Sequence, residues 1–258
     1  MAQVNKSQMR AASQDMRVQA TLNEALQAQA RDLSDAYEER LARALNEQWP
    51  GGGSARQASH HDHATVLCAA LVDQAAWSMR LAAPDMAKLL KRFYDYCGDT
   101  VFLFGAHSLQ FQGDGVVAVF ADGPDAPVSS PHGLRAAKAA LALRKAVAGL
   151  NALLQTMPAD ESLHSLDIGV ALHSGPVAMM RLDGLLGGAA QSVPVGETVV
   201  DAMALQKHAQ SAGRTGINVS AQVLRSITGA VQPTRRYLLA LPHRTDPMDV
   251  CMVEPLSN

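Results

Sequence analysis

Two short segments hold the side chains most able to do chemistry. The first is Gly113-Asp114-Gly115, which separates two runs of β-prone residues, and an Asp-Gly pair in such a position is typical of a β-hairpin. Asp114 would lie at the hairpin tip, where a carboxylate can meet a cation, or it could simply form the turn. The second segment is His60–His63, with three histidines around one aspartate. It falls in a linker without a rigid scaffold, so we assign it no function.

The composition excludes several classes of protein. Lys and Arg number 22 against 24 Asp and Glu, a net charge of −2, so there is no basic excess to neutralise a nucleic-acid backbone. No apolar run reaches the roughly 18 residues of a membrane span, and the first residues lack the apolar core of a signal peptide. Cys68, Cys97 and Cys251 have no metal-ligand spacing and are expected to be reduced thiols in a cytoplasmic protein.

The N-terminal part, residues 1–49, is predicted to be a helical stalk. Residues 14–49 contain no Gly or Pro, and their apolar residues, mostly four or seven apart, form one stripe of a long helix. The stripe consists of Val18, Leu22, Leu26, Leu33, Tyr37, Leu41 and Leu45. We expect a two-stranded coiled coil, and the alternative is a helix that folds back on the following domain. Residues 50–63, which begin with one Pro and three Gly, are expected to be a linker.

Residues 64–255 are predicted to form one α/β domain of the α+β sandwich type. The expected elements, in order, are strand 64–72, a helix from Pro84, strands 108–112 and 116–120, helix 133–157 and strand 166–172. This order is that of a ferredoxin-like βαββαβ unit. Helices near 199–212 and 221–227 and strands near 217–220, 237–241 and 249–253 complete the expected domain.

Three stretches of this domain resemble the class III adenylate and guanylate cyclases. Residues 109–120, LQFQGDGVVAVF, resemble the family hairpin K-x-x-G-D-x-x-x-A-x-F. Residues 168–177, IGVALHSGPV, resemble I-G-I-H-T-G-x-V, and residues 195–205, VGETVVDAMAL, resemble V-I-G-D-x-V-N-x-A-x-R-L. The stretches occur in the family's order, and the helical stalk resembles the signalling helices that often precede such domains.

The resemblance implies a site that is split across a dimer. Such domains convert a nucleoside triphosphate into a cyclic nucleotide and pyrophosphate, and two aspartates hold two Mg²⁺ or Mn²⁺ ions. A Lys and an Asp or Thr read the base, while an Asn and an Arg of the facing subunit position the ribose and stabilise the transition state. The implied partners are a nucleoside triphosphate and a second cyclase domain, in a homodimer or a heterodimer.

The two metal positions carry over unequally. Asp114 matches the second metal aspartate of the family. For the first, the family reads F-x-D-I-x-G-F-T, and the aromatic and hydroxyl positions of LVDQAAWS favour Asp73. An alignment without gaps from Asp114 places Ala70 there instead. We expect Asp73 and Asp114 to hold the metal, because loop lengths vary more readily than strand ends.

The other functional positions depart from the family. Its base-reading Lys falls at Gln110, its second base-reading residue at Val193, its Asn at Val200 and its Arg at Ala204. Because charged donors at a developing phosphoryl charge account for much of the catalysis, we expect an impaired enzyme that acts as a dimeric signalling or regulatory module. The alternatives are the metal-donating half of a heterodimeric cyclase and an active cyclase with altered residues.

Overall fold

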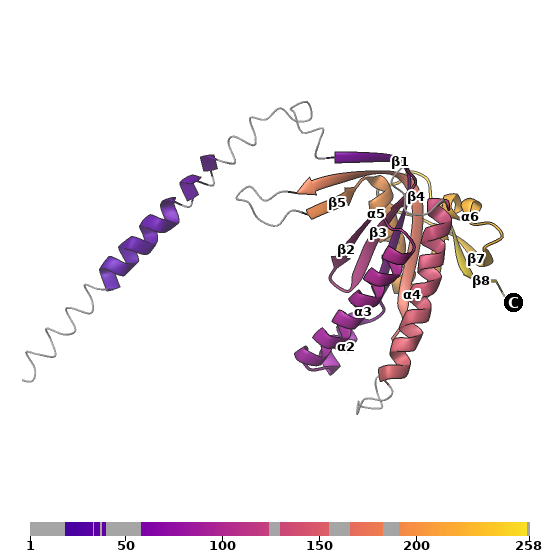
Figure 1. Cartoon of the computed structure of the whole chain (residues 1–258), viewed down its shortest axis with the longest axis horizontal. Coiled ribbons are helices and arrows are strands. Elements are labelled where there is room, and N and C mark those ends of the chain that lie inside the picture. The colour runs from indigo at the N-terminus through magenta and orange to yellow at the C-terminus, as the bar shows by residue number, and fades with distance from the viewer. Residues whose placement is uncertain are drawn as a thin grey trace, which may run out of the picture. The chain divides into compact units, whose positions relative to one another are not determined.

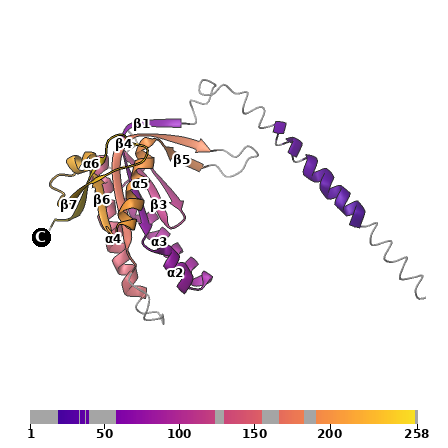
Figure 2. The ribbon, with the colours of Figure 1, turned by 180° about the vertical axis from the view of Figure 1, so that it is seen from behind.

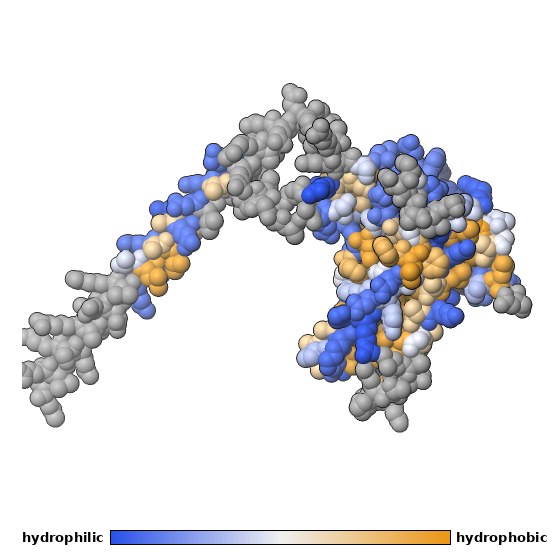
Figure 3. All heavy atoms as spheres, in the orientation of Figure 1, coloured by the Kyte–Doolittle hydropathy of each residue, from blue (hydrophilic) through white to orange (hydrophobic). Residues whose placement is uncertain are grey.

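The chain divides into two compact units, residues 1–56 with 182–191 and residues 57–181 with 192–258. The computed structural model describes residues 19–32, 34–36, 38–39, 58–123, 130–154, 166–182 and 191–256. In the first unit, the described residues between 19 and 39 are helical. Leu22 and Leu26 of the predicted stripe are 58% and 55% exposed, and apolar and polar patches lie side by side on this helix (Figure 3). The coiled coil stays a prediction.

The second unit is built on one mixed sheet of eight strands (Figure 1). The strands are β1 (Ala58–Leu71), β2 (Ser108–Gln112), β3 (Gly115–Ala121), β4 (Ile168–Leu182), β5 (Gln191–Val195), β6 (Gly216–Ser220), β7 (Val231–Leu239) and β8 (Met248–Pro255). Their order is β2-β3-β1-β4-β6-β8-β7, and β5 pairs with β4. The pair β4–β6 is parallel, whereas β1 pairs antiparallel with both β3 and β4.

Helices cover both faces of the sheet. They are α2 (Gln74–Arg80), α3 (Ala83–Leu103), α4 (His132–Leu154), α5 (Glu197–Ser211) and α6 (Ala221–Ser226). Because side chains of a strand alternate between faces, Leu67 and Leu71 of β1 join the core with α3 and α4, whereas Val66 and Cys68 pack with Val199 of α5. Figure 2, which views the molecule from the opposite side to Figure 1, shows α5 as well. Among the described helices, none is both long and apolar enough to cross a membrane.

Helix α3 shows how the sequence pattern determines these contacts. Its buried residues are Met86, Leu89, Phe93, Cys97 and Val101, and their spacing of three or four places them on one face of the helix. The opposite face is mostly polar as far as Asp99 and gives the diagonal hydrophilic band in Figure 3, whereas Phe102 and Leu103 of the last turn are exposed apolar residues. The Pro84 expected to open this helix lies in its first turn, where the missing N–H is not needed.

The predicted ferredoxin-like order is confirmed, with differences at several ends. Strand β1 begins at Ala58, so residues 58–63, expected in the linker, belong to the sheet. They pair with the end of β4, which runs ten residues beyond its expected end at 172. Most side chains of residues 59–63 are exposed, so a polar sequence can form this extension. Helix α2 and strand β5 were not expected from the sequence.

Candidate functional site

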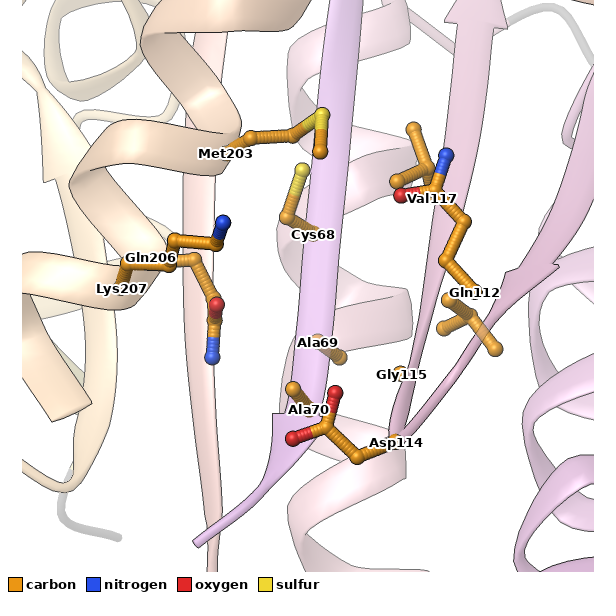
Figure 4. A pocket seen from close by; sticks show the side chains of 11 residues that line it. Cys68, Ala69, Ala70, Gln112, Asp114, Gly115, Val117, Met203, Gln206 and Lys207 are labelled. Carbon is orange, nitrogen blue, oxygen red and sulfur yellow. The ribbon is translucent and has the colours of Figure 1, made fainter.

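A pocket of about 200 Å³ opens between the sheet and α5. Its lining includes Cys68 and Ala70 of β1, Asp114 of the β2–β3 hairpin, and Met203 and Lys207 of α5. The close-up in Figure 4 shows Ala70 beside the Asp114 carboxylate, with the α5 side chains on the far side of β1. Two of the three family-like stretches, the hairpin and the helix, therefore contribute to one cavity.

The register of the sheet fixes the hairpin tip against the end of β1. The Leu71 amide donates to the Asp114 carbonyl oxygen at 3.0 Å, and Ala70 pairs with Gly115. A Cβ on Gly115 would lie 2.5 Å from the Ala69 carbonyl oxygen and 2.8 Å from the Ala70 Cβ. A glycine is thus required here for close approach of the two strands.

We expect Gly115→Ala to destabilise the domain by about 1–3 kcal/mol, because its methyl group overlaps the backbone of β1. Urea denaturation would measure the change. Gly149→Ala is the matched control: a Cβ there meets nothing within 4 Å, and alanine is favoured over glycine within a helix by about 1 kcal/mol. A Gly115→Ala variant as stable as the unmodified chain would contradict the register described here.

Helix α3 holds the hairpin from the other side. The Tyr94 hydroxyl donates to the Gly113 carbonyl oxygen, and its ring lies 4.8 Å from that of Phe111, centre to centre. Burial raises the pKa of Tyr94, and the Asp114 carboxylate adds to the rise. Tyr94 is therefore a neutral donor at pH 7, and the backbone next to Asp114 is fixed by side-chain contacts as well as by the sheet.

Asp73 lies outside this arrangement. It is exposed, adopts a left-handed conformation with φ 58°, and precedes α2 without a capping bond from its side chain. It is not among the residues that line the pocket, which contains Ala70 instead. The structure thus brings Asp114 together with Ala70, and a metal role for Asp73 stays a prediction.

The donor set of the pocket does not fit two shared cations. Among the described residues, Asp114 is the one carboxylate in its lining, and the ammonium-bearing Lys207 lines it too. Within the described ranges, no three His, Cys, Asp or Glu side chains are placed to hold one metal ion. A pair of divalent cations bound close together needs several oxygen ligands with negative charge, which these residues do not supply.

Solved structures identify the architecture around this pocket. The guanylyl cyclase Cya2 matches with a TM-score of 0.66 at 18% identity, over 78% of this chain and 95% of its own. The adenylyl cyclase CyaB from P. aeruginosa matches with a TM-score of 0.65 at 17% identity, over 78% and 97% of the two chains. The chain has the class III nucleotide cyclase fold. The guanylate cyclase domain of RhGC from Catenaria anguillulae, solved in complex with GTP, matches at 0.59 and 21%, over 77% and 100%.

The cyclase fold rests on structure alone. No protein-family model and no curated protein matches the sequence. The TM-scores of 0.59 to 0.66 establish the cyclase fold, and at identities of 17% and 21% the reaction has to be argued from the site. The resemblance drawn from the three sequence stretches is confirmed at this level.

Gln110 and Val193, which the sequence resemblance assigns to the family's base-reading positions, contribute to the packing of the strands. Gln110 is buried, 5% exposed, and its side-chain amide donates to the Ser192 carbonyl oxygen at 3.0 Å. This bond ties β2 to β5. Val193, the second base-reading position, is a half-buried apolar residue of β5. Gln110 therefore donates one of its two amide N–H groups to the backbone and carries no charge, and the Val193 side chain offers a base no polar group.

The positions of the family's Asn and Arg are apolar in α5. Val200 is 51% exposed, so its isopropyl group faces solvent. Ala204 is half-buried and packs against the cluster of Leu205 and Leu239. Neither side chain has a group that can bond a ribose or a phosphate.

Asp201 follows Val200 in α5 but, unlike it, points into the protein, where it forms a network of charged groups that the sequence did not reveal. It is fully buried. One oxygen accepts from Nε2 of His243 at 2.7 Å, and the other is bonded by Arg244 and lies 3.3 Å from Nε2 of His173. Burial lowers the pKa of His173, and the nearby Asp201 partly opposes this. Asp201 thus holds the loop between β7 and β8 on α5 and cannot replace the missing Asn.

Proposed function

We propose that this chain is a catalytically silent domain of the class III cyclase fold that acts as a dimeric signalling or regulatory module. The observation that carries the proposal is the pairing of Ala70, rather than a carboxylate, with the hairpin of Asp114. The family's reaction needs two metal aspartates, and the pocket has one.

The remaining positions support the same conclusion. Val200 and Ala204 provide neither the polar nor the cationic group expected from the facing subunit, and the amide of Gln110 is engaged with Ser192. Each charged or polar donor at a developing charge contributes several kcal/mol to catalysis. Because such contributions act in the transition state, saturating substrate cannot replace them.

A role through assembly fits the rest of the chain. Leu22 and Leu26 of the predicted stripe are exposed in the single chain, and both would be covered in a parallel coiled coil of two copies. One structure of this fold is that of a non-canonical dimeric guanylyl cyclase domain of a Blastocladiella emersonii fusion protein. We propose a homodimer or a heterodimer with another cyclase domain, in the cytoplasm.

A second function is favoured by one observation. Asp114 is retained at the hairpin tip and lines the pocket, so the chain could donate part of a metal site to a different, intact cyclase domain. Mg²⁺ or Mn²⁺ and a nucleoside triphosphate would be the ligands of that heterodimer. Product formation on mixing with a cyclase that lacks its own metal aspartates would favour this function over the silent module.

Mn²⁺ binding tests the basis of the proposal. Followed by electron paramagnetic resonance, Ala70→Asp is expected to bind Mn²⁺ at least about tenfold more tightly than the unmodified chain, equivalent to about 1.4 kcal/mol. Adding Asp114→Asn should remove the gain, whereas adding Asp73→Asn should leave it. The contrary result would be that Asp73→Asn and Asp114→Asn, each made in the unmodified chain, weaken Mn²⁺ binding equally. Asp73 would then be the metal ligand, and the proposal of a catalytically silent domain would lose its main support.

A further inference from the structure

A second group of ligand-bearing side chains lies at the opposite end of β1 from the pocket. His61 is nine residues before Ala70 on this strand, a separation of about 30 Å in an extended chain. It lies just before the irregularity in the β1–β4 register between His61 and Ala64. Such bulges often redirect a side chain at a functional position.

The rings of His61 and His107 are in contact. Their centres are 4.7 Å apart and their planes are inclined by 73°. A metal ion bonded to imidazole nitrogens at about 2.0–2.1 Å lies about 3.2 Å from each ring centre. An angle of about 90–110° at the metal would then separate the ring centres by about 4.5–5.2 Å. The observed separation, which is that of an edge-to-face ring contact, falls within that interval and is compatible with one ion between the two rings.

The inner nitrogen of His61 needs a partner. Its Nε2 atom is buried and has no hydrogen-bond partner among the residues that the structure describes. A buried polar atom without a partner is costly and calls for an explanation. A metal ion bonded to this nitrogen would satisfy it, because an imidazole nitrogen is the commonest metal ligand among side chains.

A thioether lies on the same face. Met179 of β4 pairs with Ser59 of β1, and paired residues point to the same face of the sheet. Ser59 and His61 are two residues apart on β1, so Met179 and His61 lie on the same face of the strand pair. Met179 is 4% exposed, and its sulfur lies 3.8 Å from the hydroxyl of Ser108, the residue after His107. Met179 and His61 are diagonal neighbours on the two strands, a separation that long side chains can bridge.

Two imidazoles and a thioether select among metals. Structural zinc takes four N, S or O ligands, whereas thioethers favour Cu(I) and imidazoles also suit copper. We propose that His61, His107 and Met179 form a copper site on the β1–β4 extension, separate from the cyclase-type pocket. The site takes copper in its cuprous form, with His107 at the solvent-exposed side.

Competition for Cu(I) against a colorimetric chelator, under anaerobic conditions and with tag-free protein, tests this site. We expect one equivalent of Cu(I) per chain, and at least about tenfold weaker binding for His61→Ala and for His107→Ala. Met179→Leu should weaken Cu(I) binding and remove the sulfur contribution from the X-ray absorption spectrum of the bound copper. His60→Ala is the matched control, because His60 is a neighbouring exposed histidine that pairs with Asp62 at 3.1 Å.

Circular dichroism of each variant would establish that it is folded before binding is compared. Loss of binding in His61→Ala and His107→Ala with retention in His60→Ala supports the site. Equal losses in all three variants would show general chelation by a histidine-rich strand and overturn it. Failure of the unmodified chain to compete for Cu(I) would overturn it as well.

Discussion

The triple variant Ala70→Asp, Val200→Asn, Ala204→Arg is expected to form cyclic nucleotide from ATP or GTP at least about 100-fold faster than the unmodified chain in the presence of Mn²⁺. The first change places a carboxylate beside Asp114 in the pocket, and the other two return the polar and cationic groups of the family to α5. One donor to a developing charge alone is worth about 10²–10³ in rate. Mass spectrometry of the cyclic product would measure the gain.

A matched control separates this effect from added charge. Ala75 lies on α2 and is exposed, so Ala75→Asp in place of Ala70→Asp adds the same carboxylate away from the pocket. Gln110→Lys with Val193→Asp should be added last, because Gln110 also holds β5 through Ser192. An equal gain with Ala75→Asp, or no gain in any folded combination, would contradict the assignment of the pocket as a degenerate cyclase site.

Asp201→Asn is expected to destabilise the domain by about 2–4 kcal/mol. Removing one partner of a buried ion pair typically costs about 3–5 kcal/mol, and the value is smaller here because Arg244 and His243 are 26% and 36% exposed. The variant leaves Arg244 and His243 without the carboxylate that holds their loop on α5. Thermal and urea denaturation at neutral pH would measure the loss.

Asp249→Asn is the corresponding control at the surface. Asp249 pairs with Arg236 at 3.5 Å, and both side chains are well exposed, so its loss should change stability by no more than about 1 kcal/mol. Equal effects of Asp201→Asn and Asp249→Asn would show that the buried network contributes little, and the loop between β7 and β8 would have to be held by its apolar contacts.

Local sequence signals were sufficient for the part of the site that depends on neighbouring residues. The Asp-Gly pair and its β-prone flanks predicted the hairpin, and the structure places Asp114 at its tip. The family-like spacing in residues 195–205 predicted that Val200 and Ala204 occupy one helix. These signals act over a few residues, where turn chemistry and helical periodicity determine the geometry.

The end of β1 was harder to predict because its register depends on distant strands. Trp77 and Ser78 suggested an aromatic-hydroxyl match that favoured Asp73, but Trp77 belongs to α2 and its side chain packs in the core. The residue beside Asp114 is decided by the pairing of Ala70 with Gly115. A strand register is set by the hydrophobic pattern and the turn geometry of both strands, and the alignment without gaps from Asp114, which placed Ala70 there, is consistent with this pairing.

The Asp201 network lay beyond any local pattern. Its members come from β4, α5 and the loop before β8, so sequence separations of 28 and 42 residues had to be closed by the fold. The one local signal was an aspartate on the buried side of a helix with many apolar residues, since buried carboxylates are normally paired. The identity of the partners required the structure.

Turnover by the unmodified chain distinguishes a silent domain from a working cyclase. The full chain, over a range of concentrations, would be incubated with ATP or GTP and Mn²⁺, and cyclic AMP and cyclic GMP would be measured by mass spectrometry against an Asp114→Asn variant. A silent domain predicts product at the level of that variant for both nucleotides. Product formation well above that level, and abolished by Asp114→Asn, would show a working cyclase and contradict the account.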